Sequence, residues 1–189
     1  MNVFYLDQDP ILAAHYHNDK HCNKMLLEYA QLFQNCFTIE QLQHAPKTKV
    51  DTFRKHTHLN HPSSLWVKET RANMKWLLRM LTELEKERIY RGFKPHFTST
   101  FISWARKNFR NSQVPEGRKQ TALKIAISED AECRKYIKDF DQLPPVQQYR
   151  LYYVFDKEPI LHWTHRTEPE WLEMYREIKK QAKINNEHS

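Results

Sequence analysis

Apolar residues recur every three or four positions along most of this chain, which is the spacing of amphipathic helices. The two longest runs of this kind cover residues 9–37 and 63–91. Asp9 followed by Pro10 is a favourable helix start, and Gly92 is a natural residue just after a helix end. The pattern therefore predicts two long helices, one over each run.

Shorter runs of helical spacing follow later in the chain, over residues 97–109, 129–140, 146–155 and 167–180. Thr167-Glu168-Pro169-Glu170 resembles a capping box at the start of the last one. The apolar run at residues 3–6 is typical of a short extended arm. With only two glycines, Gly-rich hairpins and phosphate-binding loops are disfavoured. We predict an all-α fold: one compact multi-helix domain over 1–189 with a short extended N-terminal arm and a frayed tail at 181–189.

A stripe of polar, titratable side chains interrupts the apolar surface of the first predicted helix. Steps of four, three, four and three place its members on one helical face: His17, His21, Lys24, Glu28 and Gln31. A carboxylate between cations can support acid–base chemistry or anion binding. The alternative is an exposed face with a solvated ion pair, which contributes about 0–1 kcal/mol to stability.

The net charge of the chain indicates which class of partner it would bind. The net charge is +7 and aromatic residues make up 13% of the chain, which suits a polyanion such as nucleic acid. Cations and aromatics alternate in residues 104–110 and 149–153. Such segments can hold phosphates and stack bases, although aromatics in the core beside solvated cations would give the same pattern.

Other chemistry has little support in the sequence. There is no Gly-x-Ser-x-Gly, no phosphate loop and no Cys/His nucleophile signature. His56, His58 and His61 lie beside basic residues, without a His-Glu-x-x-His pattern or a cysteine pair, so we expect phosphate contact or plain surface there rather than a metal. We expect no cofactor. The cysteines stand at unrelated spacings and are expected to be reduced: Cys22, Cys36 and Cys133.

Membrane insertion and export are not expected. No apolar run approaches the roughly 18 residues of a membrane span, and the N-terminus lacks a charged region followed by an apolar one. We therefore expect a cytoplasmic protein with no membrane partner. No pattern in the sequence indicates an oligomeric state.

Three blocks of the sequence are similar to one known family. The first, MNVFYLDQDPILAAHYHNDKHCNKMLLEYAQLF, resembles the N-terminus of a bacteriophage family related to the pyrimidine-dimer DNA glycosylases of the endonuclease V type. The family's Asp-x-His, with a Glu seven residues after the His, occurs here as Asp19-Lys20-His21 and Glu28. HPSSLWVKETRANMKWLLRMLTELEKERIYRGF is similar to its long helix ending in Arg-Gly. Tyr149-Arg150-Leu151-Tyr152-Tyr153, with Trp163 and Pro169-Glu170-Trp171, resembles its closing helices.

The resemblance implies an all-α protein that binds double-stranded DNA and flips a nucleotide out of the stack. In such glycosylases the α-amine of the chain attacks the sugar C1′ while a glutamate assists. Carried over, Glu28 is the catalytic carboxylate, Met1 the amine nucleophile, and His21 binds or orients phosphate. An α-amine with a pKa of about 8 is partly neutral at pH 7 and can act as a nucleophile. The expected DNA contacts are His17, Lys24, Arg71, Arg91, Arg106, Lys107 and Arg150.

Three functions follow as alternatives. The leading one is a DNA glycosylase acting on an extruded pyrimidine, in the host cytoplasm if the chain is phage-encoded. AP-lyase activity is open, because the large Asn2 favours retention of Met1. The second is a transferase that modifies a thymine derivative in phage DNA, favoured by Met1 retention and by residues 93–143, which match nothing in the family. The third is a non-catalytic DNA-binding or host-interaction protein with Glu28 in a structural role.

Overall fold

The computed structural model describes residues 2–48 and 52–187, and all regular structure in these residues is helical. The predicted all-α class is confirmed. The α-helices are α1 (Pro10–Tyr16), α2 (Asp19–Gln34), α3 (Ile39–Gln43), α4 (Pro62–Glu69), α5 (Arg71–Tyr90), α6 (Ser99–Lys107), α7 (Glu132–Tyr136), α8 (Pro145–Asp156) and α9 (Leu172–Glu187). Short 3-10 helices are η1 (Thr52–Arg54), η2 (Phe109–Asn111), η3 (Phe140–Gln142) and η4 (Glu158–Ile160).

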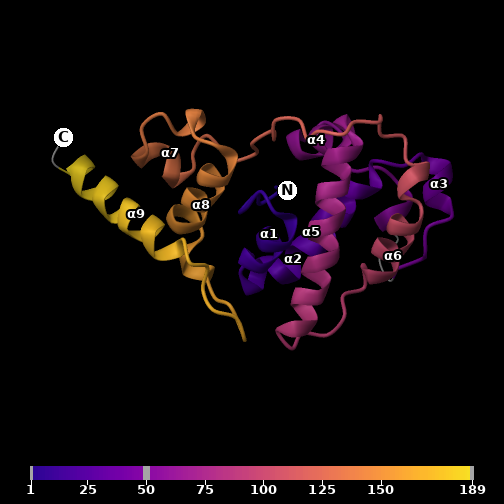
Figure 1. Cartoon of the computed structure of the whole chain (residues 1–189), viewed down its shortest axis with the longest axis horizontal. Coiled ribbons are helices and arrows are strands. Elements are labelled where there is room, and N and C mark those ends of the chain that lie inside the picture. The colour runs from indigo at the N-terminus through magenta and orange to yellow at the C-terminus, as the bar shows by residue number, and fades with distance from the viewer. Residues whose placement is uncertain (1, 49–51, 188–189) are drawn as a thin grey trace.

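Helix α5 is the central element of the fold. It packs against α1, α2, α4 and α6, while α7, α8 and α9 form a second group at the other end of the elongated molecule (Figure 1). The segment 112–131 runs along one edge and connects the two ends (Figure 1). One continuous apolar cluster extends through both groups, so the chain forms a single domain.

Each of the two long predicted helices is divided into two by a capping residue. At His17 the backbone is extended (φ −61°, ψ 131°), and the Asn18 side chain accepts a hydrogen bond from the His21 N–H at 2.9 Å. At Thr70 the backbone is again extended, and its hydroxyl accepts from the Asn73 N–H at 3.2 Å. Asn and Thr side chains compete with the helical backbone for hydrogen bonds and favour such starts. The prediction of single helices over 9–37 and 63–91 is therefore wrong.

The predicted end of the second run is confirmed at Gly92. This residue has φ +81°, and its N–H donates to the Ile89 carbonyl at 2.9 Å. The Phe93 N–H donates to the Arg88 carbonyl at 3.1 Å, which completes a Schellman motif. A glycine is favoured here because other residues adopt the left-handed conformation at a cost.

The later segments agree with prediction in part. Helices α6 and α8 match the runs at 97–109 and 146–155, whereas 129–140 holds only the five residues of α7 and part of η3. The expected capping box at Thr167 does not start a helix; α9 begins at Leu172 and continues through the described part of the expected frayed tail. No helix in residues 2–48 and 52–187 is long and apolar enough to cross a bilayer.

A buried ionic network explains why the chain before α9 is not helical. Arg166 donates to Glu87 of α5 at 2.6 Å, and Glu87 also accepts from Arg91 at 2.7 Å. Arg91 reaches Asp19 of α2 at 3.0 Å, and Asp19 accepts from the Thr164 hydroxyl at 2.7 Å. These contacts hold the α8–α9 connection, which turns at residues 164–166, against α2 and α5.

Candidate active site on the N-terminal face of α2

The N-terminal segment lies across α2 as the predicted arm. The Phe4 N–H donates to the Tyr29 hydroxyl at 3.2 Å, and the Phe4 ring stacks on His21 with centroids 4.2 Å apart. Asn2 donates to the Ala126 carbonyl at 3.1 Å and accepts from the Tyr149 hydroxyl at 2.5 Å. Asn2 is thus held between the segment 112–131 and α8, next to Phe4 on α2. Met1 lies outside the described residues.

Glu28 is on the same helix, one position before Tyr29. Its side chain is 17% exposed, and its Oε1 lies 3.2 Å from the Nζ of Lys24, which is 66% exposed. A half-buried carboxylate under an exposed ammonium group can interact with a reacting centre that develops positive charge. The pair is an i, i+4 contact, as the sequence predicted.

His17 does not reach the surface, in contrast to the expected DNA contact. Its Nδ1 donates to the Ala13 carbonyl at 2.7 Å, and its Nε2 accepts from the Tyr29 hydroxyl at 2.6 Å. The side chain is fully buried, which lowers its pKa to about 4. His17 is therefore neutral at pH 7 with both ring nitrogens occupied, and it supports the tyrosine that holds Phe4.

His21 is also a buried, neutral histidine. Its Nδ1 lies 2.7 Å from the Tyr153 hydroxyl of α8, and one face of its ring is covered by Phe4. Burial is the main cause that lowers its pKa to about 2. It cannot supply a positive charge to a phosphate at neutral pH. We place it as a positioning residue that holds the N-terminal segment, rather than as a catalytic group.

Three lysines surround this face. Lys20 and Lys24 are on α2, directly before His21 and one turn after it, and their charges and that of Lys157 add to the burial that lowers the pKa of His21. Lys157 Nζ is 4.6 Å from the centroid of the Tyr152 ring, which lies parallel to the Phe4 ring at 6.1 Å. The face therefore combines a carboxylate, three cations and aromatic rings, which can bind an anion beside a base or sugar.

Arg91 and Arg150, two of the expected DNA contacts, belong to the framework. The Arg91 side chain is 0% exposed and is held by Glu87 and Asp19. Arg150 donates to the Leu6 carbonyl at 2.9 Å and to Asp7 at 3.0 Å. Arginines held in this way contact the protein rather than a ligand.

The other expected arginine and lysine contacts lie away from Glu28. Arg71 begins α5 and donates to the carbonyls of Arg110 and Val114, both at 3.2 Å, which fastens that loop. Arg106 and Lys107 are exposed at the end of α6. Among the described residues of the predicted set, the structure brings Lys24, His21 and Glu28 together, with the buried His17 ring 6.5 Å from the His21 ring.

The second histidine group does not converge. His56 Nε2 donates to the Phe37 carbonyl at 2.7 Å, His61 caps α4, and His58 sits in a turn with φ +49°. In the described ranges no three His, Cys, Asp or Glu side chains gather as a metal ion would require. All three cysteines are free and buried, as expected.

Sequence reasoning missed several members of the site. Lys20 lies inside the Asp19-Lys20-His21 motif and could have been found from it. The sequence pattern indicates only that Phe4 is an apolar residue of the arm. The residues around Lys157 do not indicate a role in the site, because it is the packing of α8 that brings Lys157 to α2. The chain matches no protein-family model, no curated protein sequence and no solved structure, so the site rests on its own residues.

Proposed function

We propose that this chain is a DNA-binding enzyme that acts on an extruded pyrimidine base in duplex DNA, as a DNA glycosylase. The observation that carries the proposal is the N-terminal segment held across α2 beside the Lys24–Glu28 pair. Phe4 contacts Tyr29, which directly follows Glu28 on α2, and this contact supports a role for the N-terminal segment beside that carboxylate. The similarity to the pyrimidine-dimer glycosylases supports the same pairing.

In this mechanism the α-amine attacks C1′ of the extruded nucleotide and the glycosidic bond breaks. The electron pair of that bond leaves with the base, which takes up one proton lost by the amine. The C1′–O4′ bond then breaks as the C1′–N double bond of an imine forms, and O4′ takes up the second proton lost by the amine. Glu28 stabilises the positive charge at C1′ or moves these protons. Lys20, Lys24 and Lys157 hold the flanking phosphates.

Borohydride trapping tests this mechanism. Duplex oligonucleotides carrying an abasic site or a pyrimidine dimer are incubated with the protein and reduced, and the covalent adduct is measured. Wild-type protein should form the adduct, and N-terminally acetylated protein should not. Glu28→Gln should slow base release by about 100-fold or more, which is the usual size of such a contribution.

Glu40→Gln is the matched control, since it neutralises an exposed carboxylate on α3. It should react like wild type. If Glu28→Gln turns over these substrates as fast as Glu40→Gln, the assignment of Glu28 is wrong. If acetylation leaves the adduct intact, another amine is the nucleophile.

A transferase acting on a modified thymine is the second candidate. It is favoured by the contact between Asn2 and Ala126, because the segment 112–131 belongs to the region that the family similarity does not cover. That segment would alter which base or reaction the site accepts. Mass spectrometry of phage-type hypermodified DNA after incubation separates the two: a mass gain on an intact strand indicates transfer, and loss of a base indicates a glycosylase.

A further inference from the structure

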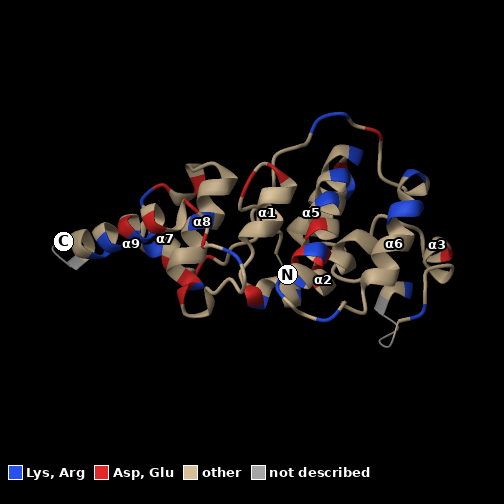
Figure 2. Cartoon of the chain, turned by 60° about the horizontal axis from the view of Figure 1, so that its bottom comes forward, with Lys and Arg blue, Asp and Glu red and all other residues tan. Residues whose placement is uncertain are grey.

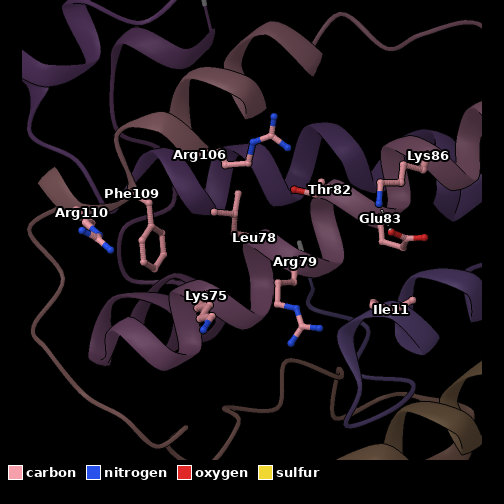
Figure 3. A pocket seen from close by; sticks show the side chains of 10 residues that line it. All are labelled: Ile11, Lys75, Leu78, Arg79, Thr82, Glu83, Lys86, Arg106, Phe109 and Arg110. Carbon is pink, nitrogen blue, oxygen red and sulfur yellow. Dashed lines mark hydrogen bonds and ion pairs between the residues drawn. The ribbon is translucent and has the colours of Figure 1, made fainter.

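A basic groove lies between α5 and α6, on a different side of the molecule from Glu28. It has a volume of about 520 Å³, and cations line both walls: Lys75, Arg79 and Lys86 on α5, with Arg106 and Arg110 beyond (Figure 3). Figure 2 shows the same feature as Lys and Arg positions repeated along α5 opposite those at α6. Such a volume suits part of a flexible ligand rather than a protein domain.

Most of these cations have no internal counter-charge. Lys75, Arg79 and Arg110 are exposed and form no ion pair with residues 2–48 and 52–187. Arg106 is exposed as well, and within the described residues it forms no ion pair. Glu83, the only carboxylate among the described residues that line the groove, is already contacted by Lys86 at 2.9 Å and His15 at 3.2 Å. The groove therefore carries an excess of positive charge that an anion would relieve.

The spacing of the cations fits an anion that extends along α5. At a rise of about 1.5 Å per residue, Lys75 and Arg79 are about 6 Å apart along the axis, and Lys86 is about 10 Å further on. Arg106 and Arg110 face them from the other wall. A single phosphate would meet only part of this row, whereas a chain of phosphates would meet all of it.

The groove also holds an aromatic surface. The Phe109 ring points into the groove between Leu78 and Arg110 (Figure 3). Phe109 and Leu78 both line the groove. The Arg71 guanidinium lies 5.9 Å from the Phe109 ring centroid. An aromatic ring between cations is the arrangement that stacks an unpaired base while the phosphates are held. Bases of a duplex are already stacked on each other, so this surface favours a single strand.

The groove is separate from the face that carries Glu28. Helix α5 stands between them: Lys75, Arg79 and Lys86 lie on the side nearly opposite Leu77, Leu81 and Leu84, which are buried in the core. Cys22 of α2 approaches the Leu84 carbonyl at 3.8 Å on that buried side. A strand in the groove therefore leaves Glu28 untouched.

We propose that the α5–α6 groove is a binding site for a single strand of nucleic acid, with its phosphates on the groove cations and one base stacked on Phe109. The proposal does not depend on the glycosylase assignment. It predicts two binding surfaces on one small protein, one for reaction and one that retains an unpaired strand.

Fluorescence anisotropy with a short labelled oligothymidylate tests the groove. The double charge reversal Arg79→Glu/Arg106→Glu should weaken binding by about tenfold or more and reduce the salt dependence of the affinity. The matched control Lys138→Glu/Lys180→Glu makes the same charge change at exposed positions on the α7–α9 end and should weaken binding less than threefold. Equal losses in both double variants would mean diffuse attraction and overturn the proposal.

Phe109→Leu tests stacking separately, because it keeps an apolar side chain and all charges. It should weaken oligothymidylate binding by about tenfold, within the range measured for base–aromatic stacking, with the salt slope unchanged. Phe109 is half-buried, so thermal unfolding is measured alongside. An unchanged affinity in a folded variant contradicts the stacking role.

Competition by four unlabelled molecules identifies the ligand class. Oligothymidylate should displace the probe far better than thymidine monophosphate, a duplex of equal length or polyglutamate at equal charge. Equal competition by the mononucleotide would indicate a nucleotide pocket, and equal competition by the duplex would indicate a duplex site. Equal competition by polyglutamate would indicate a site for an acidic protein. Each of these results overturns the proposal. Glu28→Gln should bind the probe like wild type, so a failure of the catalytic assignment can be distinguished from a failure here.

Discussion

At the scale of single residues, burial gives two histidines a role that their spacing in the sequence does not predict. His17 and His21 share a spacing with Lys24 and Glu28, which suggested one functional set. Their ring nitrogens instead bond to Ala13, Tyr29 and Tyr153 inside the fold. A neutral histidine can still matter to a site by holding the residue packed on it, and here that residue is Phe4.

These two histidines predict an acid-sensitive fold. Their pKa values in the folded protein, about 4 for His17 and about 2 for His21, lie below the usual 6.5. The unfolded chain therefore takes up protons first as the pH falls through 6.5, and stability present above that pH is lost toward the folded pKa. Below pH 6.5 and above its pKa in the folded protein, each histidine should lower the free energy of unfolding by about 1.4 kcal/mol per pH unit. Urea unfolding at pH 7 and pH 5 measures the effect.

The contribution of one histidine can be separated from the rest. His44 is exposed, and His44→Gln should leave the pH dependence of unfolding unchanged. His21→Gln should remove about half of the loss between pH 7 and pH 5. If wild-type stability is the same at both values, the two rings are not held neutral in the fold.

At the scale of elements, the sequence contains the residues that cap the helices, but the apolar spacing continues across them and predicts longer helices. The Asn18-Asp19 pair and Thr70 are ordinary helix starts, yet apolar spacing runs across both and predicted continuous helices. The Gly92 end was recognised because a glycine is a stronger stop signal than a possible cap inside a run. The delayed start of α9 had no local signal, since it depends on Glu87 and Asp19 holding the preceding segment.

The α5 end provides a test at this scale. Gly92→Ala should destabilise the fold by about 1 kcal/mol, because the residue must keep a positive φ. A Cβ at this position would meet nothing within 4 Å, so the cost is in the backbone alone. Gly92→Asn should cost less, since Asn tolerates the left-handed conformation. Thermal unfolding compares the three proteins; equal stability of the Ala variant would contradict the αL cap.

At the scale of the whole molecule, α5 separates two surfaces that differ in chemistry. One face of α2 carries Glu28 with the N-terminal segment, and the α5–α6 groove carries unpaired cations with Phe109. Arg106, expected from sequence as a contact to the same DNA as Lys24, belongs to the second surface. Only the tertiary packing reveals this division, because it buries Leu77 and Leu84 of α5 and leaves Lys75 and Arg79 on the exposed side of the same helix.

Independent surfaces should behave additively. In a double-mutant cycle, Glu28→Gln and Arg79→Glu should combine in oligothymidylate binding with a coupling below about 0.5 kcal/mol, as is usual for distant sites. The same cycle measured on base release should show the Glu28 effect in both backgrounds. A coupling well above that value would mean that one ligand spans both surfaces, in conflict with their placement on opposite sides of α5.

The sequence by itself determined the helical class, the Gly92 helix end and the Lys24–Glu28 pair, because each depends on residues within a few positions of one another. The tertiary structure alone decided which charged groups face solvent. Arg91 is buried through contacts with residues more than 70 positions away in the chain, while Lys157 and Phe4 come to the same face of α2 through packing. Burial and long-range pairing determine the charge state of a side chain and its access to solvent. The local spacing of residues contains information on neither.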